Sequence, residues 1–180
     1  MKGIVFTELF EMIEHLFGED MLDNILDDCE LETGGAYTTV GTYDYKELIE
    51  IVRVLSLHTD IPFRELVKTY GRHLFFRFHE KMPEFFEEPK NSFEFLESVH
   101  SHIHVEVKKL YPDAVLPHFD TKRNTDDVLT MIYMSHCPLA DFAEGLIAGC
   151  IEFYKENIKI ESTDYNTGTS FSRVFILTKH

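Results

Sequence analysis

The sequence of 180 residues has no tryptophan, only three cysteines and a small share of basic residues. Cys29, Cys137 and Cys150 are too few and too irregularly spaced for a disulfide framework or a four-cysteine zinc site. The 17 lysines and arginines stand against 32 aspartates and glutamates, which gives a net charge of -15. Because nucleic-acid binding needs clustered cations, this charge argues against a nucleic-acid partner and favours a partner with a basic surface.

Long uncharged stretches are missing as well. The N-terminal segment alternates apolar residues with Glu8, Glu11 and Glu14, which is unlike a signal peptide. No stretch elsewhere reaches the length of a membrane span. We therefore expect a soluble protein of the cytoplasm with no membrane partner, and the few cysteines fit a reducing compartment.

Large apolar side chains, in contrast, are abundant. Hydrophobic residues make up 44% of the sequence, and they include 16 phenylalanines and 8 tyrosines. A chain of this length can form one domain with a sizeable core. These side chains are enough to line a cavity as well as to fill a core, although composition alone does not establish a cofactor.

Hydrophobic residues recur every three or four positions through the first 80 residues, which predicts a mainly helical N-terminal half. Glycine ends the first helix, and a segment rich in glycine and threonine interrupts the pattern. The predicted elements are helices over 4–17 and 19–29, a loop over 33–42, a helix around 48–55, and a helix that starts with Asp60 as its N-cap, carries Pro62 in its first turn and ends before Pro83.

The C-terminal half mixes helices with β-prone runs. Asn91 and Glu94 have the spacing of a capping box and predict a helix that ends near Pro112. The further predictions are strands over 128–135, 158–162 and 170–177, a helix from 138 to about 156, and a turn at Asn166–Thr167–Gly168. The fold class is therefore α+β, with a helical N-terminal half joined to a half that has helices and an antiparallel sheet, and a pocket between the two is expected.

Three histidines, His100, His102 and His104, occupy alternate positions on the predicted helix after Asn91. On a helix His100 and His104 share a face, whereas His102 points elsewhere. Imidazole is a common ligand of iron, zinc and copper, but solvated or core histidines give the same pattern. A zinc site at His100 and His104 is a weaker interpretation than solvated or core histidines, since no third ligand follows at a recognised spacing.

A longer set of motifs resembles the H-NOX family, the haem sensors related to the haem domain of soluble guanylate cyclase, in its stand-alone bacterial form. The resemblance covers nearly the whole chain, and the ordered combination of a histidine, a proline and Tyr-x-Ser is more specific than any one piece. Its motifs are Met1-Lys2-Gly3, Tyr70-Gly71-Arg72, the string from Ile103-His104-Val105 to Leu116-Pro117, Tyr133-Met134-Ser135 and Ala143-Glu144-Gly145-Leu146-Ile147.

The resemblance implies a single domain over 1–180, with haem b buried between a helical subdomain of about 1–60 and an α+β subdomain of about 61–180. It makes His104 the proximal ligand of the iron and Pro117 the residue that presses on the porphyrin. It makes Tyr133 and Ser135 the hydrogen-bond donors to the haem propionates. These roles are physically reasonable, because an imidazole supplies one axial bond and hydroxyl groups satisfy buried carboxylates.

The sequence departs from the family motif Tyr-x-Ser-x-Arg, because Cys137 stands where the arginine is expected. A guanidinium clamp on a propionate would contribute about 1.5–3 kcal/mol, so we expect haem to be lost more readily than in relatives with the arginine. His136 or another basic group is a candidate replacement. Cys137 itself is expected to be an inert small side chain rather than a thiolate ligand. No cysteine follows Cys150, so we expect no structural zinc.

By the same resemblance, apolar residues without a hydrogen-bond donor line the distal pocket: Val5, Leu9, Leu74, Phe75, Phe142 and Leu146. Oxygen-binding relatives have tyrosine at the position of Phe142. A donor holds bound oxygen but is not needed for NO, so we expect the ferrous protein to bind NO and CO and to form no stable oxygen complex. Ordinary core packing would give the same apolar pattern.

The resemblance implies a sensor and not an enzyme. NO would weaken the bond between iron and His104, relieve the distortion at Pro117 and let the helical lobe rotate, with Gly71 as a candidate hinge. The expected partner is a histidine kinase or a cyclic-di-GMP enzyme. Two alternatives remain open: an interaction scaffold that has lost haem, suggested by Cys137, and a haem peroxidase, for which His73 would have to be a distal residue.

Overall fold

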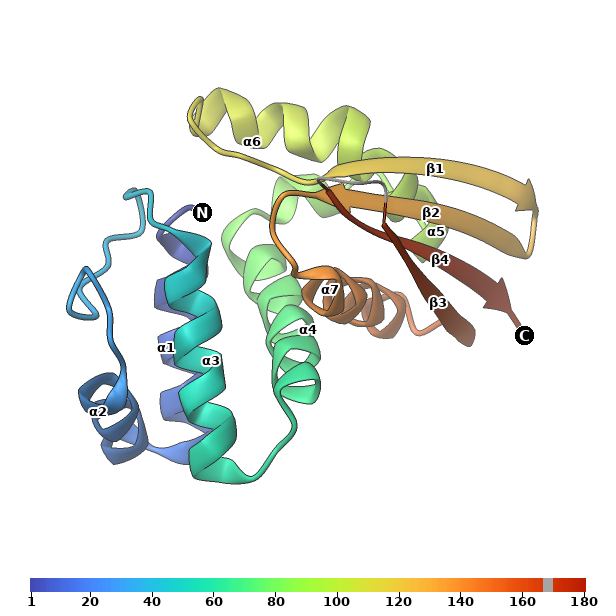
Figure 1. Ribbon diagram of the computed structural model, residues 1–180. Coiled ribbons are helices and arrows are strands. Elements are labelled where there is room, and N and C mark those ends of the chain that lie inside the picture. Colours follow the sequence, from blue (N-terminus) through green and yellow to red (C-terminus); the bar gives the residue numbers. More distant parts are fainter. Residues whose placement is uncertain (167–169) are drawn as a thin grey trace.

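Helices build the first half of the chain in the computed structural model, which describes residues 1–166 and 170–180 (Figure 1). Within these residues, no helix combines the length and the apolar character needed to cross a membrane. The first half contains α1 (Ile4–Phe17), α2 (Glu19–Asp28), α3 (Tyr45–Thr59) and α4 (Phe63–Lys81), followed by the short 3-10 helix η1 (Pro83–Phe86). The helices predicted from the sequence are therefore confirmed to within a few residues.

The second half adds further helices and a four-stranded antiparallel sheet of order β1-β2-β4-β3. Its elements are α5 (Ser92–Ser98), η2 (Val99–Ile103), α6 (His104–Leu110), β1 (His118–Thr125), β2 (Val128–Ser135), α7 (Ala140–Phe153), β3 (Ile158–Asn166) and β4 (Phe171–Lys179). The α+β class is thus confirmed. The strand β1 was not predicted, and most of the turn expected at Asn166–Thr167–Gly168 lies outside the described residues.

Helix ends agree with the sequence analysis at two places and differ at one. Gly18 ends α1 with φ 92°, and the Asn91 side chain accepts a hydrogen bond from the Glu94 amide, as the capping box predicts. The prediction of Asp60 as an N-cap is wrong. Asp60 is the C-cap of α3 in the left-handed region, and α4 starts after Pro62. Aspartate tolerates the left-handed conformation better than most residues, so it can end a helix at a turn as well as begin one.

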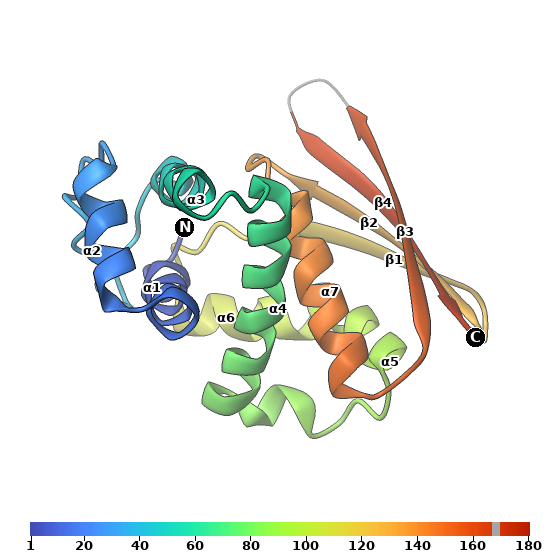
Figure 2. The same cartoon turned by 90° about the horizontal axis from the view of Figure 1, so that it is seen from below.

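α4 and α7 lie side by side in the middle of the molecule, between the N-terminal helices and the sheet (Figures 1 and 2). Glycines make this close approach possible. A Cβ on Gly71 would lie 2.3 Å from the Phe142 carbonyl oxygen, and one on Gly145 would lie 2.1 Å from the Lys68 carbonyl oxygen. Gly71 lowers the intrinsic stability of α4, but the close packing of α7 against α4 requires a glycine at this position.

The helix predicted over 91–112 is continuous in space but irregular in its hydrogen bonding. A π-helical turn, η2, separates α5 from α6 and ends immediately before His104. Single π-turns of this kind occur often at functional sites. The turn shifts the helical register, and His104 consequently opens α6 as its first residue.

Candidate functional site

His104 occupies the first position of α6, where its side chain is half-buried. Its Nδ1 is buried and has no hydrogen-bond partner among the described residues. Burial, followed by the charge of His100, lowers the pKa of His104 to about 4, and a polar contact with the Pro117 backbone opposes this shift. At neutral pH the imidazole is therefore uncharged, which is the form that binds metals.

The other histidines point away from this position or flank it. The His100 and His104 ring centroids are 6.2 Å apart, so these two residues share a face as predicted, and His100 packs against His118 at 4.1 Å. His102 is exposed and lines a groove of about 330 Å³ on the other side of α6, beside Glu84 and Glu106. The three alternate histidines thus have different surroundings, and only His104 is withdrawn from solvent.

Aromatic contacts connect His104 to the strand that carries the Tyr-x-Ser motif. Phe119 on β1 lies 5.9 Å from the His104 ring and 5.6 Å from the Tyr133 ring. Tyr133 is 3% exposed, and burial raises its pKa to about 12. Its hydroxyl donates to the Cys137 carbonyl at 3.2 Å, and Ser135 Oγ accepts a hydrogen bond from the Cys137 amide at 3.1 Å. The motif therefore shapes the loop in which the family arginine is replaced.

Cys137 is half-buried, and burial raises the pKa of its thiol. A raised pKa favours the neutral thiol over the reactive thiolate, in agreement with an inert side chain. The proposed substitute His136 is exposed. Neither residue supplies a buried positive charge at the position of the missing guanidinium.

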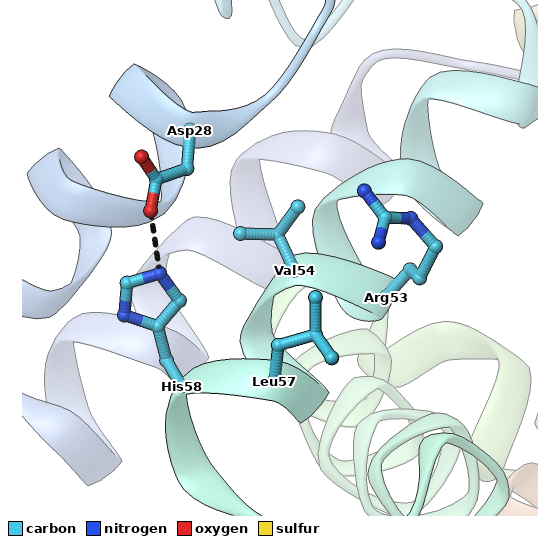
Figure 3. Close-up of a pocket in the computed structure, with 5 residues that line it drawn as sticks. All are labelled: Asp28, Arg53, Val54, Leu57 and His58. Carbon is cyan, nitrogen blue, oxygen red and sulfur yellow. Dashed lines mark hydrogen bonds and ion pairs between the residues drawn. The ribbon is translucent and has the colours of Figure 1, made fainter.

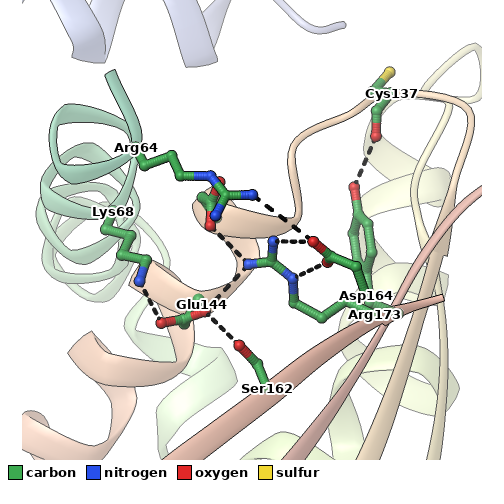
Figure 4. A network of polar contacts seen from close by, with 9 residues as sticks. Arg64, Lys68, Cys137, Glu144, Ser162, Asp164 and Arg173 are labelled. Atoms are coloured by element: carbon green, nitrogen blue, oxygen red, sulfur yellow. Dashed lines mark hydrogen bonds and ion pairs between the residues drawn. The ribbon is translucent and has the colours of Figure 1, made fainter. Parts of the chain in front are cut away.

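Arg173, the residue paired with Tyr133 across β2 and β4, is the nearest arginine in the sheet register, but it is fully engaged (Figure 4). Its guanidinium donates to Asp164 at 2.5 Å, to Asp141 at 2.7 Å and to Glu144 at 3.2 Å, and its side chain is 6% exposed. Lys68 on α4 joins the same network through Glu144 at 2.7 Å. The network ties the first turns of α7 to the sheet and to α4, so Arg173 does not replace the missing clamp.

Three elements meet where the sequence predicts a distal wall. Phe142 on α7 is half-buried and lies 5.2 Å from the ring of Tyr70 on α4. The Tyr70 hydroxyl donates to the carbonyl oxygen of Val5 on α1. Leu146, one turn after Phe142, packs against both hydrophobic clusters of the molecule. Val5, Phe142 and Leu146 are half-buried side chains, and of the three Leu146 contacts both clusters.

The remaining predicted distal residues are differently placed. Leu9 and Leu74 are 0% and 1% exposed and belong to the core of the helical part. Phe75 belongs to the other cluster, where its ring lies 5.4 Å from Phe86 and 5.3 Å from Phe95. Leu146 packs against the cluster that contains Phe75 as well as against the cluster that contains Leu9 and Leu74.

Two residues of this region were not predicted as site residues: Tyr70, which the sequence analysis named only as part of a motif, and Phe119. Tyr70 is fully buried, but in a helical pattern it has the signature of any core residue. Phe119 is the only buried residue of β1, whose other positions are polar or exposed, so the strand lacked the alternation that predicts a sheet. Only the contacts of these residues distinguish them.

A surface groove of about 300 Å³ between α2 and α3 contains none of the predicted site residues (Figure 3). It is lined by Asp28, Arg53, Val54, Leu57 and His58, and His58 pairs with Asp28 at 2.8 Å. The groove is open to solvent and lies in the helical part. The candidate site instead comprises the neutral imidazole of His104 on α6, the end of β2, and the half-buried apolar side chains on α1 and α7.

The residues of this region fit a haem. A buried neutral imidazole with an unpartnered nitrogen suits an axial ligand, and half-buried apolar side chains suit the porphyrin faces. The hydroxyl-bearing residues Tyr133 and Ser135 follow on the adjacent strand. The weak point of the fit is the lack of a cation at Cys137.

Comparisons with known proteins agree with this class of site. The family model HNOB, described as Haem-NO-binding, matches residues 2–162. The Fe(II) unliganded H-NOX protein from K. algicida is 38% identical, with a TM-score of 0.91 over 100% of this chain and 97% of that chain. The H-NOX from Shewanella woodyi, solved in the Fe(II)CO state, is 43% identical, with a TM-score of 0.84 over 100% and 95%. The comparison with curated proteins finds no match.

A third solved structure, an H-NOX protein from S. oneidensis in the Fe(II)NO state, is 23% identical, with a TM-score of 0.86 over 99% of this chain and 100% of that chain. At this identity the likeness concerns the fold alone. The class defined by the fold and the comparisons is a haem-based gas sensor domain rather than an enzyme. The chain belongs to the Haem-NO-binding, or H-NOX, family.

Proposed function

We propose that this protein senses nitric oxide through a haem b held by His104 and passes the signal to a partner protein. The observation that carries the proposal is the half-buried, uncharged imidazole at the start of α6, whose buried Nδ1 has no hydrogen-bond partner in the described part of the chain. When bound, the haem would supply the iron that takes up the gas, and His104 would be the residue that holds it. All other components of the proposed sensor are residues of this protein.

The polar and rigid residues around His104 would orient the group. Tyr133 and Ser135 present hydroxyl groups at the end of β2, and such groups offset the cost of burying propionates. Pro117 lies beside the His104 ring and has a fixed backbone torsion, so it can press on a macrocycle without yielding. These roles follow from the family resemblance and from the positions of the residues.

The distal wall favours NO and CO over oxygen. Val5, Phe142 and Leu146 have no donor, and the hydroxyl of the neighbouring Tyr70 is occupied by the Val5 carbonyl. Bound oxygen carries partial negative charge and needs a donor, worth about 1 kcal/mol, whereas NO does not. The S. woodyi and S. oneidensis proteins were solved with CO and NO, respectively.

The signal would leave the site through helix movement. If gas binding loosened the hold of the haem on His104, α6 would be free to move, and the helical lobe of about 1–60 would rotate against the rest of the domain. Gly71 is the candidate hinge, because it lies in the tight α4–α7 contact, where a side chain would clash with the Phe142 carbonyl oxygen and force the helices apart. We propose a histidine kinase or a cyclic-di-GMP enzyme of the cytoplasm as the partner.

Absorption spectra of the purified protein test the proposal. The ferrous protein should show a Soret band that moves to the five-coordinate nitrosyl position on addition of NO and shifts with CO, but that forms no stable oxygen complex in air. A stable oxygen spectrum would contradict the distal assignment. The lack of any Soret band after expression with ample haem would favour a haem-free interaction scaffold, the alternative that the missing arginine supports.

The Cys137→Arg substitution is expected to slow haem loss by about tenfold or more. A guanidinium paired with a propionate contributes about 1.5–3 kcal/mol, and Cys137 stands at the motif position that Tyr133 and Ser135 both contact. Transfer of haem to excess apomyoglobin measures the rate. The control is His136→Arg, which adds the same charge one residue earlier at an exposed position. Equal rates in the wild type and in Cys137→Arg would refute the clamp argument.

A further inference from the structure

A polar cluster joins the N-terminal residues to the segment that follows α6. Lys2 Nζ lies 3.2 Å from Asp113 Oδ2, and Thr42 Oγ1 donates to the same oxygen at 2.5 Å. Lys2 also donates to the Val40 carbonyl at 2.7 Å and to Thr42 at 2.9 Å, and its side chain is only 10% exposed. We call Lys2, Thr42 and Asp113 the latch.

The helical side of the latch is rigid. Lys2 and Thr42 form an antiparallel bridge, and the Gly3 amide donates to the Gly41 carbonyl at 2.8 Å. A Cβ on Gly3 would lie 1.8 Å from the Thr38 carbonyl oxygen, so this pairing is too close for any other residue. Lys2 is therefore fixed to the helical lobe, and its long side chain has little freedom to follow Asp113 if that residue moves.

The other side of the latch lies between the two residues assigned to the haem. Asp113 follows α6, nine positions after His104 and four before Pro117. Lys2 Nζ also lies 5.3 Å from the centre of the Tyr111 ring at the end of α6. Across the described residues, every hydrogen bond and ion pair between residues 1–60 and 99–118 ends on Asp113.

From this geometry we infer that Lys2, Thr42 and Asp113 are positioning residues that hold the α6–Pro117 segment against the helical lobe in the resting state and separate when the sensor is activated. The inference rests on the proposed function and identifies the latch as the contact that breaks during activation. A small, partly exposed contact suits this task, because one that is too strong would prevent the transition. Asp113 is 59% exposed, which leaves water ready to replace its partners.

Hydrogen exchange of the haem-loaded protein, with and without NO, tests the latch. In the wild type, NO should raise exchange in residues 38–43 and 111–117 by about two- to fivefold, the range for a partly exposed polar contact. In Asp113→Ala both segments should exchange at the raised rate before NO is added, with little further change. Resonance Raman spectra of the ferrous variant should show a flatter haem than the wild type.

Matched variants separate the latch from general effects. Asp126→Ala removes an equally charged, exposed side chain from the β1–β2 turn and should behave as the wild type. Thr42→Val should reproduce part of the Asp113→Ala effect and add little to it in the double variant, since both act through one contact. An unchanged NO response of exchange in Asp113→Ala overturns the latch even if NO binds normally. Absence of NO binding in the wild type would instead overturn the proposed function.

Discussion

His104→Ala is expected to abolish haem binding in the absence of added imidazole, with haem content falling at least tenfold below that of the wild type. The substitution removes the proposed protein bond to the iron, and hydrophobic contacts alone do not hold the group at purification concentrations. Exogenous imidazole should restore the colour by filling the vacated space. The haem content is measured by the Soret absorbance of protein expressed and purified with and without imidazole.

Restoration by imidazole also tests whether NO binding is coupled to movement of α6. A free imidazole is not attached to α6, so NO can displace it without moving the helix, and the exchange response of residues 111–117 should disappear. His102→Ala is the control, because it removes a histidine two positions away that faces the outer groove. Haem content and NO response should be unaltered in this control. A coloured, NO-responsive His104→Ala protein without imidazole would end the proposal that His104 is the ligand.

Phe142→Tyr is expected to give the ferrous protein a measurable oxygen complex, with oxygen affinity raised about five- to tenfold. The new hydroxyl would stand on α7 in a wall that has no free donor, since Tyr70 already donates to the Val5 carbonyl. One hydrogen bond to bound oxygen in a dry pocket contributes about 1 kcal/mol or more, which corresponds to this factor. Oxygen titration of the reduced protein, followed by absorption, measures the change.

Phe153→Tyr provides the matched control for this result. It makes the same chemical change at the end of the same helix, but Phe153 packs with Phe75 and Phe86 in the other hydrophobic cluster. Oxygen affinity should stay at the wild-type level there. If both variants gain oxygen binding, or neither does, the distal position of Phe142 is wrong.

Local sequence signals predicted the helices well, because helix formation depends on spacing and caps within a few residues. The glycine end of α1 and the Asn91 cap are examples. Asp60 was misjudged, since an aspartate can open a helix or close one, and the choice depends on where the chain must turn between α3 and α4. β1 was missed because its charged residues pair with β2 through the backbone, which leaves little trace in the side-chain pattern.

The candidate site was predictable only in part. His104, Tyr133 and Ser135 were predicted from motifs, and the burial that makes the imidazole neutral became visible only in the folded chain. Phe75 has the same apolar character as Leu74, and only the direction of its side chain assigns it to a different cluster. Arg173 was overlooked because its three carboxylate partners come from α7 and β3.

The sequence by itself determined the α+β class, the helical start, the acidic charge and the family, because composition, periodicity and linear motifs act over short ranges. The tertiary structure decided which histidine is withdrawn from water, which hydroxyl groups are already occupied, and that Lys2 meets Asp113 across 111 positions of the chain. Such contacts depend on how distant segments pack, and desolvation and hydrogen bonding at a site follow from that packing.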